Sequence, residues 1–258
     1  MYSNPMYYAK HFYILDENNE YYEIRELEIP EIKEEITYEV VGTKVDTLII
    51  PNTIKSFGNS FYGCNNLKTI YYNGTLEDWC NISFVSSYSN PMYYAEHIYM
   101  LDENNEYYEV KELEIPETID KIDKYQFYGF NVTKVTLPSS IVSIGASAFS
   151  NCNIKYINNL SDIVLTIGSS SNGYIALNAS LIVDKEGNSV FKERDTFVYN
   201  NEYIFKYENS NYFLREYIGT KETITLPLTI NESSYYIDRF KGGVNVIIPE
   251  GFKSINII

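Results

Sequence analysis

Short hydrophobic segments that end in proline recur along this chain in pairs that lie 21 or 22 residues apart. The prolines form three such pairs: Pro30 with Pro51, Pro116 with Pro138, and Pro227 with Pro249. Each segment has β-branched or leucine residues in alternation, which is typical of a β-strand, and proline ends the pairing of that strand. A unit of about 22 residues cannot bury its own apolar side, so the repeat predicts stacked units with one continuous core.

The residues that follow the prolines also repeat. Segments 51–70 and 138–157 read PNTIKSFGNSFYGCNNLKTI and PSSIVSIGASAFSNCNIKYI, with apolar residues at matching places. We expect four of these apolar side chains to be fully buried: Phe57, Phe61, Ile144 and Phe149. Segments 31–47 and 122–131 lack parts of this pattern, so we expect irregular coils there.

Segments 51–70 and 138–157 resemble the BspA-like leucine-rich repeats. Segment 71–99, YYNGTLEDWCNISFVSSYSNPMYYAEHIY, is similar to an accessory element that such proteins insert between repeats. The resemblance implies a mostly β fold: a right-handed solenoid with a parallel sheet on one face, short helical turns on the other, and inserted β-hairpins. It also implies a secreted or cell-surface protein that binds other proteins, in adhesion or host interaction.

A longer duplication lies over the short repeat. Residues 3–31 recur as residues 89–117, with 24 of the 29 aligned positions identical. Each copy contains two strand-like runs joined by the acidic, Asn-rich sequence LDENNE, which indicates a hairpin. We therefore place accessory units at 1–24 and 71–112.

The rest of the chain divides at changes in this pattern. We expect residues 1–157 to form the solenoid with its accessory units. Residues 158–222 read as an irregular coil followed by a β-meander, with strands at 196–199, 203–208 and 211–218. Residues 223–258 resume the repeats and stop halfway through one. Neither end reads as a capping unit, so we expect the chain to be part of a longer array.

The charge and the hydrophobic pattern of the chain disfavour some classes of partner. The 258 residues carry a formal net charge of −15, which disfavours nucleic acid and anionic membranes because both attract clustered Lys and Arg. No apolar run approaches the roughly 18 residues of a membrane-spanning helix, and the N-terminus does not read as a signal peptide. We expect a monomer without membrane insertion in this segment. A basic partner and a plain role of the charge in solubility both stay open.

Candidate catalytic groups are few. The chain has two histidines, His11 and His97, at the same place in the two long repeats. Its three cysteines, Cys64, Cys80 and Cys152, fit no zinc or redox spacing and read as small buried apolar residues. No Ser-His-Asp or Cys-His set can be assembled from the spacing. We therefore expect no enzymatic activity and no cofactor.

The LDENNE segments offer oxygen ligands that calcium prefers, but their spacing is not that of a calcium loop. A hairpin turn is the favoured interpretation, and calcium stays an alternative. The residues concerned are Asp16, Glu17, Asn18 and Glu20, and again Asp102, Glu103, Asn104 and Glu106.

Tyrosine is the residue type that points most directly to binding. The chain has 27 tyrosines, several of them in adjacent pairs, and neighbours on a strand face opposite sides. At least one ring of each hairpin pair is therefore expected on the surface, either packed under an insertion or free to bind. Tyr and Trp are enriched at binding hot spots. The predicted binding residues are Tyr21, Tyr22, Tyr107, Tyr108 and Trp79.

These observations predict a non-enzymatic, surface-displayed scaffold that binds a protein partner, such as a host or matrix component. Two alternatives stay open. In the first, the outward tyrosines and Trp79 stack on a glycan. In the second, the chain is a structural spacer.

Overall fold

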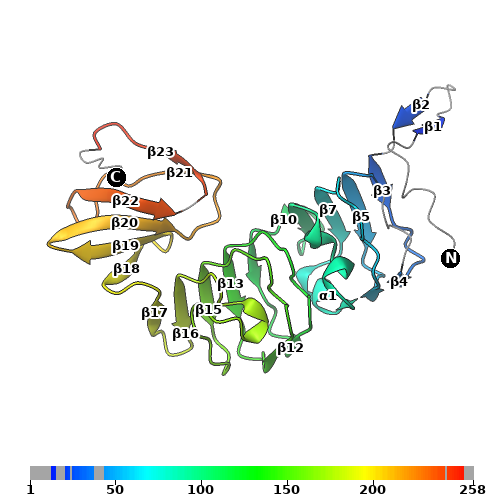
Figure 1. The fold of residues 1–258 in the computed structure, drawn as a ribbon, viewed down its shortest axis with the longest axis horizontal. Helices are drawn as coiled ribbons and strands as arrows, with labels where there is room; N and C mark the ends of the chain where they lie inside the picture. Colours follow the sequence, from blue (N-terminus) through cyan, green and yellow to red (C-terminus); the bar gives the residue numbers. More distant parts are fainter. Residues whose placement is uncertain (1–12, 16–20, 24, 38–43, 242, 253–258) are drawn as a thin grey trace.

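The computed structural model describes residues 13–15, 21–23, 25–37, 44–241 and 243–252. Its strands form a curved stack of coils that continues into a C-terminal sheet (Figure 1). Each coil contributes one strand to a long sheet on one side and a short strand or helical turn to the other side. The mostly β solenoid that the family resemblance implied is confirmed.

The long side of the solenoid contains two five-stranded sheets. The first sheet runs in the order β10-β9-β7-β5-β3. Its strands are β3 (Glu26–Glu28), β5 (Thr47–Pro51), β7 (Thr69–Asn73), β9 (His97–Leu101) and β10 (Tyr107–Glu109). The second sheet runs in the order β11-β13-β15-β16-β17. Its strands are β11 (Glu112–Glu114), β13 (Lys134–Leu137), β15 (Tyr156–Asn159), β16 (Leu181–Asp184) and β17 (Ser189–Phe191).

The opposite side, called here the turn side, has shorter elements. Its strands are β4 (Glu35–Ile36), β6 (Ser56–Phe57), β8 (Ser83–Phe84), β12 (Lys121–Ile122) and β14 (Ser143–Ile144). Its helical turns are α1 (Leu76–Cys80), η2 (Ser87–Ser89), η3 (Pro91–Tyr93) and η4 (Asn172–Tyr174). Thr75 caps α1 through a reciprocal pair of hydrogen bonds with Asp78, which explains how so short a helix begins at this point.

The strand register reproduces the sequence repeat. Val135 of β13 pairs with Ile157 of β15, and Leu48 of β5 pairs with Ile70 of β7, all in parallel. Alternate residues of these strands point inward and form one buried cluster from Ile29 to Ile182. The cluster is the continuous core that stacked coils are expected to bury.

Three of the four residues expected in the core are buried: Phe57, Phe61 and Phe149. The expectation for Ile144 is wrong, because this side chain is only half-buried. Ile144 lies on β14, which pairs with β12 alone, whereas Phe57 lies on the middle strand of a three-stranded sheet.

The coil at 122–131 is regular, which corrects the expectation of irregularity there. β12 pairs with β14 in the same parallel register as the long strands. The rings of Phe127 and Phe149 stack with centroids 5.3 Å apart and planes at 23°. The departure from the repeat sequence lies at the residues of this coil that contact the inserted segment, which are described below.

The parallel stack continues beyond residue 157, because β16 pairs in parallel with β15. β17 then returns antiparallel to β16. The C-terminal sheet follows in the order β18-β19-β20-β22, and its first three strands are antiparallel, as expected for the meander. Its elements are β18 (Thr196–Tyr199), β19 (Tyr203–Glu208), β20 (Asn211–Tyr217) and β22 (Tyr235–Lys241). The unit boundaries at 157 and 222 stay predictions.

A final parallel pair resumes the repeat spacing. β21 (Thr223–Thr225) pairs with β23 (Asn245–Ile247), and Ile224 lies opposite Val246. Ile224 packs with the C-terminal sheet in a second buried cluster that includes Phe205, Leu214 and Tyr235.

A third cluster joins the C-terminal sheet to the solenoid. Leu181 of β16 packs with Ile204 and Ile218, and Tyr156 and Val183 contact this group. Two polar contacts lie beside it. Thr133 donates a hydrogen bond to the Gly219 carbonyl, and the Lys111 ammonium lies 2.7 Å from the Glu222 carboxylate. The C-terminal part of the chain therefore contacts the solenoid at β15 and β16 and next to β11 and β13.

Candidate binding surfaces

The hairpin β9–β10 forms as predicted for the second long repeat. β9 and β10 are antiparallel, and Asp102 closes the turn by accepting hydrogen bonds from the backbone N–H groups of Asn104 and Glu106. These bonds hold the pKa of the Asp102 carboxyl below its usual value. The hairpin-turn interpretation is confirmed for residues 102–106.

The first copy can be compared only in part. β1 (Tyr13–Leu15) and β2 (Tyr21–Glu23) pair antiparallel, as β9 and β10 do. Its acidic turn and the side chains of Tyr21 and Tyr22 lie outside the described part of the chain.

Tyr107 and Tyr108 are both on the surface, with exposed fractions of 47% and 39%. Tyr107 lies on the outer face of the sheet, where its hydroxyl donates a hydrogen bond to Asn73. Its ring contacts Tyr71, which stacks on Tyr99 with centroids 4.9 Å apart. We call Tyr71, Tyr99 and Tyr107 the sheet-face cluster. Burial raises the pKa of both Tyr99 and Tyr107, so their hydroxyls stay protonated and can donate hydrogen bonds.

Charged groups border the sheet-face cluster. Glu109 lies 2.6 Å from His97 Nδ1 and 3.1 Å from Lys111 Nζ. Burial alone would raise the pKa of Glu109, but hydrogen bonds with His97 and Lys111 outweigh it and hold the pKa below its usual value. Lys111 also pairs with Glu222, so these charges connect the hairpin to the C-terminal part of the chain.

A larger group of tyrosines lies on the turn side. We call it the tyrosine ridge, and it consists of Tyr62, Tyr88, Tyr93, Tyr94, Tyr125 and Tyr128. Successive ring centroids lie 5.6 Å apart between Tyr62 and Tyr88, 4.6 Å between Tyr88 and Tyr93, and 5.6 Å between Tyr93 and Tyr128. The rings therefore form one contiguous aromatic surface.

The ridge is assembled from two coils and the insertion. Tyr62 follows the buried Phe61, Tyr128 follows the buried Phe127, and Tyr88 and Tyr93 lie on η2 and η3. Half of the Tyr62 side chain is exposed, and Tyr88 and Tyr93 are exposed by 37% each. The hydrogen bond with Tyr88 raises the pKa of Tyr93 to about 12.

Sequence reasoning missed most of this ridge. The pair Tyr93–Tyr94 stood out as a doublet, but the other four tyrosines did not. The signal that could have found two of them is the recurrence of Phe-Tyr-Gly at Phe61–Gly63 and Phe127–Gly129. In both places the Phe enters the core and the next side chain points outward.

Trp79 lies in the core, and its prediction as a surface binding residue is wrong. Its exposed fraction is 0%, and its ring contacts Tyr72, Phe84 and Phe130. Its indole N–H donates a 2.9 Å hydrogen bond to the Gln126 carbonyl, while the Gln126 side chain donates to the Trp79 carbonyl. Trp79 therefore attaches the insertion to the coil at 122–131 and cannot stack on a sugar.

Two further contacts hold the insertion against the coil at 122–131. The Asn90 side-chain amide donates to the carbonyls of Tyr125 and Gln126. Gly129 has a φ of +76°, and a Cβ at this position would collide with the Met92 carbonyl oxygen. Gln126 and Gly129 are thus the residues through which this coil accepts the insertion.

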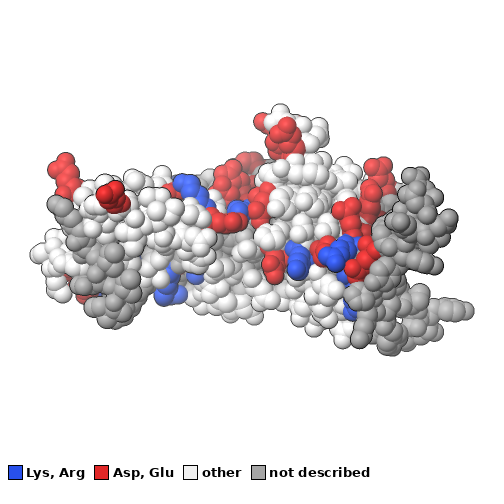
Figure 2. Space-filling view, turned by 90° about the horizontal axis from the view of Figure 1, so that it is seen from above, with Lys and Arg blue, Asp and Glu red and all other residues white. Residues whose placement is uncertain are grey.

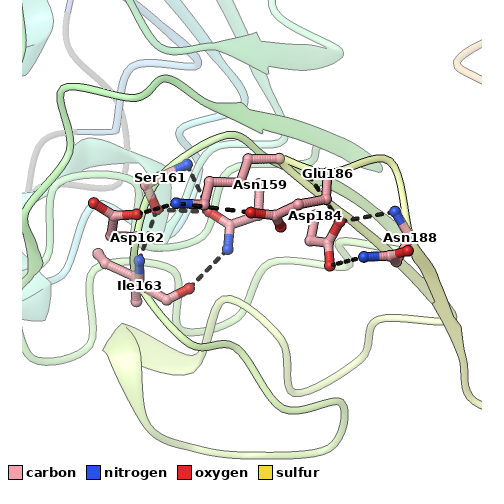
Figure 3. A network of polar contacts seen from close by, with 8 residues as sticks. Asn159, Ser161, Asp162, Ile163, Asp184, Glu186 and Asn188 are labelled. Atoms are coloured by element: carbon pink, nitrogen blue, oxygen red, sulfur yellow. Dashed lines mark hydrogen bonds and ion pairs between the residues drawn. The ribbon is translucent and has the colours of Figure 1, made fainter.

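A polar network near the end of the solenoid is structural (Figure 3). The buried Asn159 donates to the Ile163 carbonyl and accepts from the Ser161 hydroxyl, which shapes the turn after β15. Asp184 accepts hydrogen bonds from Glu186 and Asn188 in the β16–β17 turn. Its pKa is held below the usual value, with the hydrogen bond from the Asn188 side chain as the main cause. The side-chain oxygens of Asn159 and Asp184 thus accept hydrogen bonds from neighbouring residues in the two turns.

The cysteines are buried, as the sequence predicted. Burial raises the pKa of both Cys80 and Cys152 to about 12, which keeps these thiols protonated and unreactive at neutral pH. Within the described ranges, no group of three or more His, Cys, Asp or Glu is placed to hold a metal ion. No helix among the described residues has the length and apolar character needed to cross a membrane.

On the face seen in Figure 2, acidic and basic groups lie in small clusters that are separated by wide areas without charge.

Comparisons with known proteins found two solved structures at low sequence identity to this chain. No curated protein matched the sequence. A leucine rich cell surface protein from Faecalibacterium prausnitzii A2-165 is 16% identical over 92% of this chain and 67% of its own, with a TM-score of 0.35. A leucine-rich repeat protein from Eubacterium ventriosum ATCC 27560 is 15% identical over 96% of this chain and 60% of its own, with a TM-score of 0.30.

The family comparison covers most of the sequence. The BspA type leucine rich repeat region, with six copies, matches residues 18–105 and 102–193. The matched residues include the stacked coils, the hairpin β9–β10 and the insertion. The chain belongs to the BspA type leucine-rich repeat family.

Proposed function

We propose that this chain is a non-enzymatic scaffold that is displayed outside the cell and binds a protein partner through the tyrosine ridge. The observation that carries the proposal is the contiguous, partly exposed aromatic surface of six tyrosines on the turn side. Monomeric proteins rarely expose large contiguous apolar patches, and such patches mark interaction sites.

The ridge is not needed to fill the core. The coils beneath it are already filled by phenylalanines such as Phe61 and Phe127. Tyrosine also has a polar tip, which suits a ring that is wet in the free protein and dry in a complex. Two hydroxyls are already held in place. Tyr94 accepts from the Gly63 N–H, and Tyr128 accepts from the Asn151 side chain.

The surroundings of the ridge favour a protein partner. Small polar side chains lie beside it, and the Ser86 hydroxyl donates to the Asn59 side chain in the same region. Tyrosine combined with serine, asparagine and glycine is the composition of antibody binding loops, where rigid rings provide area and small polar groups adapt to the partner.

The sheet-face cluster is a second candidate surface. It includes Tyr107, and Tyr108 lies next to it on β10. The pair Tyr21 and Tyr22 would repeat this arrangement at the first hairpin, since both hairpins are antiparallel and have nearly the same sequence.

Two triple variants distinguish the surfaces. The ridge variant is Tyr62→Ser, Tyr88→Ser and Tyr93→Ser. The control is Tyr107→Ser, Tyr108→Ser and Tyr207→Ser, which removes three tyrosines of similar exposure elsewhere. Proteins captured by the wild-type chain are purified, and their affinities for all three chains are measured by surface plasmon resonance.

We expect the ridge variant to bind at least about tenfold more weakly and the control to bind as the wild type does, because hot-spot truncation costs about 2 kcal/mol or more. Melting temperatures show whether each variant is folded. Loss of binding in the control alone would move the site from the ridge to the surfaces around Tyr107, Tyr108 and Tyr207.

The same variants test the glycan and spacer alternatives. Burial of Trp79 removes the ring best suited to stacking on a sugar. A glycan-array signal that the ridge variant abolishes, without any protein partner, would replace the protein proposal with a glycan one. Partners that bind all three chains equally would place the binding site outside both aromatic surfaces, and a wild-type chain that captures no partner would favour the spacer role.

Family membership supports display at the cell surface, as the resemblance implied. An antibody against the solenoid should label intact cells of the source organism as strongly as permeabilised cells. Label that appears only after permeabilisation would contradict surface display.

A further inference from the structure

A cavity between the solenoid and the C-terminal sheet is lined by several basic side chains. Its volume is about 350 Å³. The basic residues that line it are Lys155, Lys192, Lys206, Arg215 and Lys241. The whole chain has only 20 Lys and Arg and a formal net charge of −15, so five around one cavity is a strong local concentration.

The fold brings these residues together from both parts of the chain. Lys155 directly precedes β15 of the solenoid, and Lys192 follows β17. Lys206, Arg215 and Lys241 lie on β19, β20 and β22 of the C-terminal sheet. The cavity therefore exists because the cluster around Leu181 and Ile204 holds the two parts together.

The acidic residues at the cavity do not balance this charge. Two carboxylates line it, those of Glu193 and Glu216, against five cations. Glu216 is only 7% exposed and lies 3.7 Å from Lys155. Glu193 lies 3.9 Å from Arg215. The distance between Glu216 and Lys155 is longer than the 2.7–2.9 Å that is typical of a charge-assisted hydrogen bond.

Among the remaining cations, Lys206 is neutralised by Glu208 at 2.9 Å, although Glu208 lies outside the cavity lining. The excess positive charge therefore rests on Lys192 and Lys241. Lys192 and Lys241 form no ion pair with any residue that the structure describes. Like charges gathered in a recess repel one another, and a bound anion would relieve that repulsion.

We propose that this cavity is a binding site for a small oxyanion ligand, a molecule that carries a phosphate or carboxylate group. Its volume lies within the range of small-molecule sites. Arg215 has a planar fork of donors that matches such groups, and its side chain is only 14% exposed. Partial burial strengthens the attraction between this cation and an anion, because the local dielectric constant is lower than that of water.

The proposal is independent of the protein-binding surface, because the cavity lies at the end of the solenoid that carries the C-terminal sheet. The competing explanation is that the five cations only lower the long-range repulsion within an acidic chain. That role requires charge in the region but no saturable site, so the two explanations give different binding curves.

The test is isothermal titration calorimetry of the whole chain at low ionic strength, with inorganic phosphate, pyrophosphate and citrate as separate probes. We expect saturable binding of at least one probe with a stoichiometry of one. Heat with the two phosphate probes alone would assign the site to phosphate-bearing ligands, and heat with citrate alone would assign it to carboxylates.

A pair of double variants locates the site. Lys192→Gln with Lys241→Gln should weaken binding by about tenfold or more, since each removes a cation that forms no ion pair with the described residues. The control, Lys68→Gln with Lys124→Gln, makes the same change in net charge at exposed positions elsewhere and should leave the affinity within about twofold.

Thermal unfolding provides a second readout. A ligand that binds the folded chain raises its melting temperature, so saturating probe should stabilise the wild type and the control but not the cavity variant. All three chains should melt at similar temperatures without the probe, because the substituted lysines are exposed. Absence of saturable binding for every probe, or an equal loss in the control, would overturn the proposal.

Discussion

Individual aromatic residues define the interior of each coil. Phe149 is buried, stacks on Phe127 of the neighbouring coil, and belongs to the cluster that extends from Ile29 to Ile182. Removal of this ring would leave a cavity that rigid neighbouring coils cannot fill.

We expect Phe149→Ala to lower the free energy of unfolding by about 3–5 kcal/mol, because the substitution loses buried apolar area and leaves a void. Urea denaturation measures this change. Val142→Ala is the control, since Val142 is 75% exposed in the same coil and its truncation should cost less than about 0.5 kcal/mol. A loss below about 1 kcal/mol for Phe149→Ala would mean that the coil is not built around this ring.

The repeat predicts core residues such as Phe149 because each one recurs about 22 positions along the chain, although the half-buried Ile144 shows that matching positions are not always equally buried. The repeat gives no information about Trp79, which occurs once. The partner that fixes Trp79 in the core is Gln126, 47 residues away, and no local pattern connects the two. The prediction for Trp79 rested on the general enrichment of Trp at binding surfaces, which favoured an exposed position.

At the scale of elements, the insertion and the coil at 122–131 depend on each other. The helical turn η3 lies against Gly129, whose positive φ and missing Cβ leave room for the Met92 carbonyl. The sequence alone showed that this coil differs from the other repeats. It did not show that the differing residues pack against the insertion.

We expect Gly129→Ala to separate the insertion from this coil. Gly168→Ala is a matched control, because Gly168 has a φ of +79° and a Cβ added there would have nothing within 4 Å. Both variants bear the cost of a left-handed alanine, on the order of 1 kcal/mol. Only Gly129→Ala adds a clash with backbone, so its loss of stability should be at least about twice as large.

Fluorescence separates these variants further. The chain has a single tryptophan, Trp79, which is buried where the insertion contacts this coil. Gly129→Ala should shift its emission to longer wavelength as water reaches the ring, and Gly168→Ala should not. Unchanged emission in both variants would mean that the insertion tolerates a displaced Met92.

Over the whole molecule, charges near the sheet face connect the hairpin to the C-terminal part. Lys111 lies between Glu109 and Glu222, and the hydrogen bonds with these two carboxylates raise its pKa above the usual value. The repeat predicted the stacked coils, but not how the C-terminal sheet is placed. The contacts that place it, such as Leu181 with Ile204, join segments that share no repeat.

The lowered pKa of Glu109 makes part of the stability dependent on pH. A carboxyl whose pKa is lower in the folded chain stabilises the fold above its unfolded pKa and loses that contribution as pH falls through the folded value. We expect Glu109→Gln to melt at a lower temperature than the wild type at pH 7, with the difference disappearing toward about pH 3. Calorimetric melting curves across this range provide the measurement.

Glu114→Gln is the matched control for the pH series. Glu114 is exposed on β11 and forms no ion pair with the described residues, so this variant should follow the wild type at every pH. A difference between Glu109→Gln and the wild type that persists at pH 3 would show that Glu109 acts through packing and not through its charge.

The stacking of coils also has a mechanical consequence. Neighbouring strands such as β13 and β15 are joined side by side, so tension applied along the solenoid loads the contacts of one coil at a time. Each coil that peels away releases roughly 70 Å of extended chain from a spacing of about 4.8 Å between strands. Under load the array would therefore lengthen in steps and limit the force on whatever is bound to it, as an extensible tether does.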